Sequence, residues 1–327
     1  MLVDNHNRTI NYVRLAVTDR CNLRCNYCMP AEGIDFSAND KLLTIEEMSR
    51  LGEILVSQGV DKIRITGGEP FVRKDLMVLL KNLSKMEGLK DISVTTNATL
   101  IGPYIDELKT LGIKNINVSL DAIDKDTFER ITRRDQYDTV HNNIIRLITE
   151  GFNVRINFIV LEGQNTQDII PILELSKNFD VAVRYLEEMP FNGGTKTLDT
   201  IAWNYKRILK YVKETYPDYY KLESPKTSTS INYKIPGFKG TFGVIPSFSR
   251  TFCGSCNRLR ISATGDVITC LYAKSSMNLR RILRNGNSEE KIKEQLLKAV
   301  GSRSKTGHEA QEKYKDVFSN SMTSIGG

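Results

Sequence analysis

A repeated alternation of β-type runs with helical patterns constrains the fold of this chain more than any other feature. Six runs rich in apolar and β-branched residues predict strands near Tyr12 to Val17, Lys62 to Thr66, Asp91 to Thr96, Asn115 to Leu120, Val154 to Val160 and Val181 to Leu186. Apolar residues at helical spacing occupy the segments between these runs. Strands that alternate with helices form parallel βαβ units with right-handed crossovers, so the sequence predicts an α/β fold.

Several helix ends carry recognisable signals. Thr44 and Glu47 have the spacing of a capping box, and Asp75 is expected to cap the helix that follows it. The Leu-Gly pair ending at Gly112 and the Glu-Gly pair ending at Gly151 are typical of helix C-termini.

The number of strand-helix units favours an incomplete barrel. Six units reach about residue 190, whereas a closed eight-unit barrel usually needs ~250 residues. We therefore expect an incomplete TIM-type (β/α)6 barrel over residues 1–190 and an α+β C-terminal extension over residues 191–327 that covers the open side. The extension should contain strands near Arg258 to Ser262 and Val267 to Leu271, two helices between residues 276 and 300, and a polar tail that composition alone describes as frayed. A doubly wound open sheet is an alternative that the sequence leaves open.

Polar residues gather at the carboxyl ends of three predicted strands. They are Thr66-Gly67-Gly68-Glu69-Pro70, Thr95-Thr96-Asn97 and Ser119-Leu120-Asp121. In α/β barrels this rim carries the chemistry. Ordinary turns favour the same residue types, but their recurrence after three strands favours a site.

All six cysteines fall into two groups of three. The groups are Cys21, Cys25 and Cys28, spaced C-x3-C-x2-C, and Cys253, Cys256 and Cys270, spaced C-x2-C-x13-C. In a reducing compartment, clustered thiols are metal ligands or catalytic groups more often than disulfides. Three thiolates hold three irons of a 4Fe-4S cube, and the open iron can bind the amino and carboxylate groups of S-adenosylmethionine. Zinc is an alternative that needs a fourth ligand for each trio, and none of the three histidines lies at short spacing from either.

Charge and hydropathy limit the class of partner. The net charge of +7 indicates an acidic partner such as a nucleotide or a nucleic acid, although lysines that merely solvate the surface explain it equally well. The chain lacks a compact basic run with interleaved aromatic residues, which disfavours nucleic-acid binding. No apolar run approaches the ~18 residues of a membrane helix, and the first residues do not resemble a signal peptide. We expect a cytoplasmic protein with no membrane partner.

The motifs together resemble a known family. The run from Cys21 to Pro30, joined to Gly67-Gly68-Glu69-Pro70, resembles the radical S-adenosylmethionine superfamily. Further motifs are similar to those of the GTP 3′,8-cyclase family of molybdenum cofactor biosynthesis: Val17-Thr18-Asp19-Arg20, Ile63-Arg64-Ile65-Thr66, Asn117 to Ala122, Cys253 to Arg260 and the terminal Gly326-Gly327. The resemblance runs from about Arg8 to Gly327. It implies a lyase that converts GTP to 3′,8-cyclo-7,8-dihydro-GTP with two 4Fe-4S clusters and S-adenosylmethionine.

The resemblance also implies roles for individual residues. The six cysteines would ligate the two clusters, and the open iron of the second cluster would bind the guanine base. The implied S-adenosylmethionine contacts are Tyr27, Gly68, Ser119 and Met189, of which Met189 could equally be ordinary packing. The implied GTP contacts are Arg14, Arg64, Thr95, Arg155, Arg258, Leu259 and Arg260. Catalytic roles fall on Arg258, Arg260, Gly326 and Gly327, the last two in a tail that would reach the active site. Many relatives have lysine in place of Arg155, so the charge is retained on a bulkier side chain.

Partners follow from the same resemblance. It implies a reductant protein of the ferredoxin or flavodoxin type and a downstream cyclic pyranopterin monophosphate synthase. A homodimer rests on family analogy alone. Two other functions stay open at this point: a radical peptide-modifying maturase, which usually has more C-terminal cysteines, and a zinc-stabilised RNA-binding module.

Overall fold

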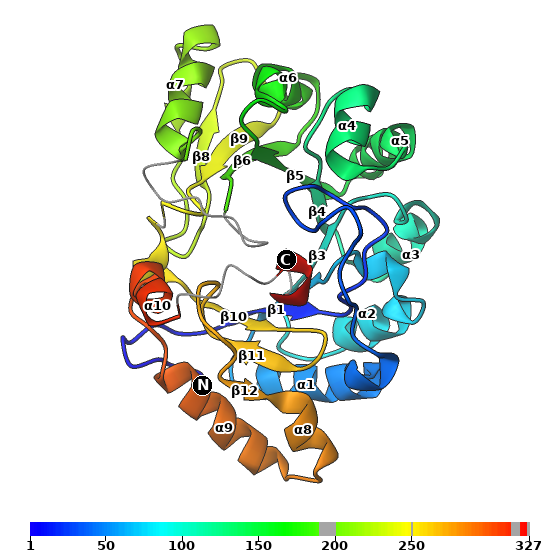
Figure 1. The fold of residues 1–327 in the computed structure, drawn as a ribbon, viewed down its shortest axis with the longest axis vertical. Coiled ribbons are helices and arrows are strands. Elements are labelled where there is room, and N and C mark those ends of the chain that lie inside the picture. Colours follow the sequence, from blue (N-terminus) through cyan, green and yellow to red (C-terminus); the bar gives the residue numbers. More distant parts are fainter. Residues whose placement is uncertain (190–200, 250, 315–320, 326–327) are drawn as a thin grey trace.

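One sheet organises the computed structural model, which describes residues 1–189, 201–249, 251–314 and 321–325 (Figure 1). Its strands are β1 (Tyr12–Ala16), β2 (Lys62–Thr66), β3 (Asp91–Thr96), β4 (Asn115–Ser119), β5 (Asn153–Val160), β6 (Ala182–Glu187), β7 (Tyr220–Lys221), β8 (Ile231–Lys234), β9 (Thr241–Ile245), β10 (Arg258–Ile261), β11 (Asp266–Ile268) and β12 (Met277–Asn278). Their order in the sheet is β12-β11-β10-β1-β2-β3-β4-β5-β6-β9-β8-β7. The six strands predicted for the barrel are confirmed, each within one residue of its expected ends.

The strand order identifies the fold class. Strands β1 to β6 are parallel and follow one another in chain order. Strand β9 joins β6 and strand β10 joins β1, both in parallel, and short antiparallel strands continue from these two edges. Because the order never reverses between β1 and β6, the doubly wound alternative is wrong. In the described residues the two end strands, β7 and β12, do not pair with each other, so the incomplete barrel is confirmed.

Helices cover the outer side of this sheet. They are α1 (Ile45–Ser57), α2 (Leu76–Ser84), α3 (Ile105–Thr110), α4 (Lys125–Thr132), α5 (Tyr137–Thr149), α6 (Ile169–Asn178), α7 (Tyr205–Thr215), α8 (Leu279–Arg284), α9 (Glu289–Gly301) and α10 (Gly307–Lys313). Figure 1 shows α1 to α6 around the outside of an arc of strands. Inside the arc lies the 3-10 segment Met322–Ile325, drawn in dark red.

The expected boundary between residues 190 and 191 lies within the segment 190–200, which is outside the described residues. The strands that follow this segment belong to the same sheet as the strands that precede it, since β9 pairs with β6 and β10 with β1. The division into two domains stays a prediction.

Residue alternation along the strands separates a helix face from a lumen face. In β5 and β6 every second residue is buried, and the residues between them are partly exposed. The buried positions, such as Val13, Ile63 and Ile156, belong to the apolar core that the strands share with the helices. We call the opposite side of the strands the lumen face. In a closed TIM barrel, branched apolar residues fill the lumen. Here the lumen face is mostly polar, which leaves it available for binding.

Most of the predicted helix ends are confirmed, with one correction. Thr44 forms the expected capping box with Glu47. Gly112 and Gly151 follow helix ends at positive φ, as predicted. Asp75 occupies the position before α2 but makes no side-chain cap bond. Its Oδ1 instead pairs with Arg73 Nε at 2.9 Å, so the expected cap is wrong.

The C-terminal extension contains more structure than its composition indicates. Helices α8 and α9 are confirmed. Strand β11 ends at Ile268 rather than at Leu271, because the chain turns there toward Cys270. Composition alone describes the tail as frayed, but residues 307–313 form α10 with Thr306 as its cap.

Candidate active site

The first cysteine trio lies on the loop that follows β1. The free thiols of Cys21, Cys25 and Cys28 influence one another electrostatically, so the structure brings the trio together as predicted. Burial raises the pKa of Cys21 to about 11 and that of Cys28 to about 12. Burial also raises the pKa of Cys25, as do the negative charges of Cys28 and Asp121. Three thiolates this close are unfavourable without a positive counter-charge, so the donor set fits a cationic iron-sulfur cluster.

The predicted polar rim surrounds this loop. Tyr27 donates a hydrogen bond to Asp121 Oδ2 at 2.7 Å, and Asn97 Nδ2 lies 3.8 Å from Cys21 Sγ. The buried carboxylate of Glu69 accepts hydrogen bonds from Asn97 N at 2.7 Å and from Thr96 Oγ1 at 2.8 Å. These bonds tie the loops after β2, β3 and β4 to the cysteine loop.

The two glycines of this rim have a structural reason to be there. A Cβ atom at Gly67, whose φ is +155°, would lie 2.4 Å from the carbonyl oxygen of Thr18. One at Gly68 would lie 2.3 Å from the carbonyl oxygen of Arg20. No side chain fits at these distances. The glycine pair therefore lets the rim pack against the chain just before Cys21, which is separate from the cofactor contact expected for Gly68.

The other two expected cofactor contacts lie in different parts of the molecule. Ser119 is the last residue of β4 and lies on the lumen face, level with Asn157 of β5. Met189 packs against the same small apolar cluster as Cys270 and Leu271 of the second cysteine segment, and Tyr272 Oη lies 3.6 Å from its sulfur. The cofactor roles of Tyr27, Gly68, Ser119 and Met189 stay predictions.

The second cysteine trio is also brought together. Cys253 and Cys256 lie in the turn before β10, and Cys270 follows β11. Burial raises the pKa of Cys270, and the negative charges of Cys256 and Cys253 raise it further. Arg303 and the backbone of Gly307 donate hydrogen bonds to this trio, to Cys256 Sγ at 3.0 Å and to Cys253 Sγ at 3.3 Å.

Strand direction places the two trios at opposite ends of the same pair of strands. The first trio follows the carboxyl end of β1, and Cys256 precedes the amino end of β10. Because β1 and β10 are parallel and Tyr12 is level with Arg258, the lumen side chains of these strands lie between the trios. A strand of five residues spans roughly 13–17 Å, which leaves room for a small molecule.

Arginines dominate the lumen face between the trios. Arg260 of β10, Arg14 of β1 and Arg64 of β2 are level with one another across three adjacent strands. Two residues closer to the second trio along these strands, Tyr12 lies level with Arg258 and Lys62. These five arginine and lysine side chains come from strands that are far apart in the sequence. The structure therefore brings together Arg14, Arg64, Arg258 and Arg260, as predicted.

The far side of the lumen continues this cationic surface. Arg155 of β5 donates a hydrogen bond to Asn115 Oδ1 at 3.0 Å. Arg184 lies on the lumen face of β6, and Thr95 on that of β3. In the part of the chain that the structure describes, Arg14 Nε, Thr95 Oγ1 and Arg184 Nε are buried without a hydrogen-bond partner. Buried polar atoms of this kind are typical of a site whose ligand supplies the partner.

The arginines perturb one another. Burial, followed by the positive charge of Arg258, lowers the pKa of Arg260 to about 10. Burial and then the charges of Arg155 and Arg64 lower the pKa of Arg184 to about 9. Burial lowers the pKa of Arg14 well below its usual range, as do Arg260 and Arg64. The lumen therefore holds an excess of positive charge that an anion would relieve.

Sequence reasoning missed three residues of this surface. Arg184 and Lys62 were not singled out, and neither was Tyr12, whose ring lies 5.3 Å from Lys62 Nζ and 5.5 Å from the guanidinium carbon of Arg64. Lys62 pairs with Asp91, whereas Arg184 forms no ion pair with another of the described residues. Strand alternation in the sequence could have identified them, because all three side chains lie on the same face of their strands as Arg14 and Arg64.

The remaining expected site residues are Leu259, Gly326 and Gly327. The side chain of Leu259 is 1% exposed and belongs to the apolar core, so any contact of this residue with a ligand would come from its backbone. Gly326 and Gly327 lie outside the described residues. The segment just before them reaches the first trio, because Ser321 Oγ donates a hydrogen bond to the Cys28 carbonyl at 2.9 Å.

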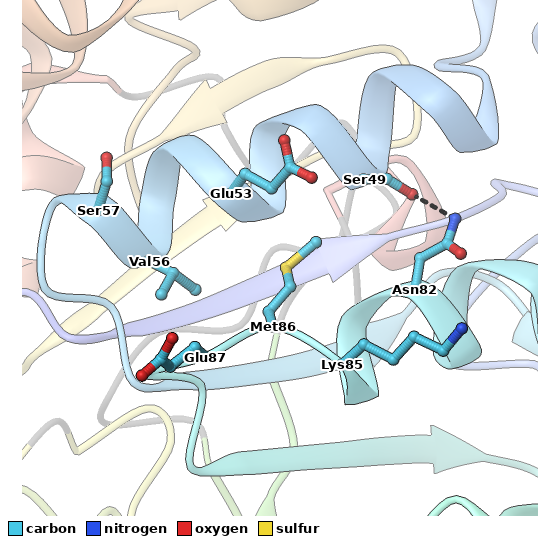
Figure 2. A pocket seen from close by; sticks show the side chains of 8 residues that line it. All are labelled: Ser49, Glu53, Val56, Ser57, Asn82, Lys85, Met86 and Glu87. Carbon is cyan, nitrogen blue, oxygen red and sulfur yellow. Dashed lines mark hydrogen bonds between the residues drawn. The ribbon is translucent and has the colours of Figure 1, made fainter.

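A separate groove lies on the outside of the molecule between α1 and α2 (Figure 2). Ser49, Glu53, Asn82, Lys85 and Met86 are among the side chains that line it, and Asn82 Nδ2 donates a hydrogen bond to Ser49 Oγ at 3.0 Å. It contains none of the predicted site residues.

Two simpler features are absent from the described ranges. There, no three His, Cys, Asp or Glu side chains are spaced to bind a single metal ion in common. The helices described are also all too short or too polar to cross a bilayer.

Comparison with known proteins gives two family matches. The model of the radical SAM superfamily matches residues 15–176, and the model described as Molybdenum Cofactor Synthesis C matches residues 181–309. The chain is 37% identical to the GTP 3′,8-cyclase of Syntrophomonas wolfei, with 94% of each protein covered. It is 40% identical to molybdenum cofactor biosynthesis protein 1 of Dictyostelium discoideum, with 94% of this chain and 49% of that protein covered. The chain spans about half the length of this and several other curated relatives.

The fold has solved counterparts. The chain resembles Streptococcus suis SuiB bound to S-adenosylmethionine with a TM-score of 0.63 and 17% identity, over 85% of this chain and 65% of that one. At this identity the likeness concerns the fold alone.

Proposed function

The chain belongs to the GTP 3′,8-cyclase family of the radical SAM superfamily, and we propose that it converts GTP to 3′,8-cyclo-7,8-dihydro-GTP, the first step of molybdenum cofactor biosynthesis. One observation carries this proposal: a lumen lined with arginines lies between two cysteine trios at opposite ends of strands β1 and β10. A triphosphate supplies the anion that this lumen lacks, and each trio supplies thiolates for an iron-sulfur cluster.

The first trio would hold the cluster of the radical SAM family. Cys21, Cys25 and Cys28 supply three thiolates, so one iron stays open for the amino and carboxylate groups of S-adenosylmethionine. When bound and reduced by one electron, this pair would supply a 5′-deoxyadenosyl radical able to take a hydrogen atom from C3′ of GTP. Closure of C3′ onto C8 of guanine would then be completed by a second electron and a proton. Tyr27 and Asp121 form a hydrogen-bonded pair beside this loop and would orient the cofactor.

The arginines would hold the triphosphate. Arg14, Arg64 and Arg260 are level on three adjacent strands, and Arg155 and Arg184 continue the surface on β5 and β6. Guanidinium groups form paired hydrogen bonds with phosphate oxygens. Since Arg14 and Arg184 each have a buried Nε without a partner in the described residues, binding would satisfy atoms that are now unsatisfied.

The second trio and the tail would complete the site. We infer that Cys253, Cys256 and Cys270 hold a second 4Fe-4S cluster, whose open iron would bind the guanine base. The turn with Cys253 and Cys256 leads directly to Arg258, which supports this assignment, because the same turn would then hold the cluster and the nucleotide. Gly326 and Gly327 would enter the same cavity, and the bond from Ser321 to the Cys28 carbonyl supports that path.

The wider context also belongs to the proposal. A ferredoxin or flavodoxin type of reductant would supply electrons, and a cyclic pyranopterin monophosphate synthase would take the product. A homodimer stays a prediction from family analogy, and a cytoplasmic location stays a prediction from the sequence. The peptide maturase and RNA-binding alternatives are not favoured, because the family matches cover nearly the whole chain.

The test is a turnover assay on anaerobically reconstituted protein. With dithionite and S-adenosylmethionine, 5′-deoxyadenosine should form rapidly when GTP is added and slowly without it, and the cyclised nucleotide should accumulate. Arg184→Met should lower the affinity for GTP more than that for guanosine. If GTP is recovered unchanged from protein with both clusters loaded, the substrate assignment is wrong.

A further inference from the structure

A buried arginine outside the lumen makes direct contact with the second cysteine trio. The side chain of Arg303 is 3% exposed. Its Nη2 donates to Cys256 Sγ at 3.0 Å, and its Nη1 donates to the Cys256 carbonyl at 3.0 Å. The guanidinium therefore binds Cys256 through both the sulfur atom and the backbone carbonyl of that residue.

A second arginine holds the same turn without reaching a sulfur atom. Arg8 Nη1 donates to the Cys253 carbonyl at 2.9 Å and to the Lys305 carbonyl at 2.8 Å. Both arginines share the fully buried carboxylate of Asp4, whose Oδ2 lies 2.7 Å from Arg8 Nε and 3.7 Å from Arg303 Nη1. The N-terminal segment and the segment after α9 are thus both anchored to the turn that carries Cys253 and Cys256.

Among the described residues, Arg303 is the nearer of the two arginines that contact the Cys256 sulfur. Arg258 is a weaker partner of Cys256, since its Nη1 lies 3.9 Å from the sulfur and its Nη2 donates to the Thr227 carbonyl at 2.8 Å.

Hydrogen bonds and positive charge at a ligand sulfur stabilise the reduced, more negative state of an iron-sulfur cluster and so raise its reduction potential. We propose that Arg303 is a positioning residue of the second cluster, which holds the Cys256 thiolate toward the iron and sets the reduction potential of that cluster. This inference rests on the proposed function, because it requires a cluster on Cys253, Cys256 and Cys270. Among the described residues, Arg8 contacts this turn through the Cys253 carbonyl and not through a sulfur atom, so we expect its effect on the cluster to be mechanical.

The contrast between the two arginines provides a matched test. The experiment uses the full chain with Cys21, Cys25 and Cys28 replaced by serine, so that only the second trio can hold iron. After anaerobic reconstitution, iron and sulfide are quantified, and the midpoint potential is measured by a redox titration followed by electron paramagnetic resonance. Arg303→Met removes both the charge and the donors, Arg303→Lys keeps the charge, and Arg8→Met serves as the control.

We expect the midpoint potential to move to a more negative value in Arg303→Met, to move less in Arg303→Lys, and to stay at the parent value in Arg8→Met. Should Arg303→Met fail to retain iron while Arg8→Met retains it, the positioning role is supported, and Arg303→Lys then reports the potential. Equal potentials in the parent and in Arg303→Met would overturn the inference, and so would equal shifts in Arg303→Met and Arg8→Met.

The measurement needs neither S-adenosylmethionine nor GTP, so it separates this inference from the proposed function. A parent protein that binds no iron on the second trio contradicts the proposed function and removes the basis of the inference. A parent that binds iron but has a potential insensitive to Arg303 contradicts the inference alone.

Discussion

Replacing Arg184 by methionine should make the protein without ligands more stable and its GTP binding weaker. Arg184 lies on the lumen face of β6, and its Nε is buried without a hydrogen-bond partner among the described residues. Burial, followed by the charges of Arg155 and Arg64, lowers its pKa to about 9 from the usual 12.5. The folded protein therefore holds this charge at a cost.

The size of that cost follows from the pKa shift. At ~1.4 kcal/mol per pKa unit, a fall from 12.5 to about 9 corresponds to an upper limit of roughly 5 kcal/mol. Water that reaches the partly exposed lumen screens the charge, so we expect a gain of ~1–3 kcal/mol in the free energy of unfolding of Arg184→Met. A base with a lowered folded pKa is penalised at every pH below that value, so the gain should be fully present at pH 7 to 8.

Binding should change in the opposite direction. A hydrogen bond to a charged group contributes ~1.5–3 kcal/mol, so the dissociation constant for GTP should rise by roughly 10- to 150-fold. Guanosine, which lacks the phosphates, should bind equally well to both proteins. Urea unfolding under anaerobic, reducing conditions measures the first effect, and isothermal titration calorimetry measures the second.

Lys62→Met is the matched control. Lys62 lies on the same lumen face but pairs with Asp91, so its removal leaves a carboxylate unpaired and should lower stability. If Arg184→Met is less stable than the parent protein, or if GTP and guanosine lose affinity equally, the reasoning that the lumen holds uncompensated charge for a phosphate is wrong.

Three further predictions concern other parts of the site. Burial raises the pKa of Glu69 to about 7 from 4.5, so the folded protein keeps a proton that the unfolded chain releases. The free energy of unfolding should therefore fall by up to ~3 kcal/mol between pH 4.5 and 7. Urea unfolding at pH 5 and pH 8 should show a smaller difference for Glu69→Gln than for the parent protein. Arg155→Lys keeps the charge and loses the bond to Asn115, so calorimetry should show GTP binding weakened by less than ~10-fold, against a larger loss for Arg155→Met. Deleting Gly326 and Gly327 should stop product formation, measured by chromatography, while the iron content stays unchanged; a parallel loss of iron would point to a structural role instead.

The fold was predictable because its signals are local. Alternating apolar residues specified six strands to within one residue, and the capping box at Thr44 and the glycines at 112 and 151 specified helix ends. Short spacing within each cysteine group likewise predicted that its members would meet. Asp75 failed as a cap because Arg73, two residues before it, offered a charged partner, which single-residue capping rules do not weigh.

The rest of the site depends on contacts between distant segments. Arg303 reaches Cys256 across 47 positions, and Ser321 reaches Cys28 across 293 positions. No spacing rule covers such separations, because three-dimensional packing determines them. Arg184 and Lys62 were different, since strand alternation alone places them on the same face as Arg14 and Arg64. Strand parity applied to every predicted strand would have found them.

The lumen and the core have opposite effects on the stability of the fold, which explains how the folded chain can hold so many arginines in its lumen. Apolar side chains on the helix face of the strands supply the burial that stabilises the fold, while the lumen face carries charges that oppose it. A ligand that binds only the folded protein stabilises it by RT ln(1 + [L]/Kd), which is ~2.7 kcal/mol at a hundredfold excess over Kd. Binding of a polyanion would relieve the repulsion among Arg14, Arg64 and Arg260. The same charges that lower the stability of the folded protein would therefore strengthen its binding to the anion. A lumen filled with leucine and valine would fold more tightly and would bind no nucleotide.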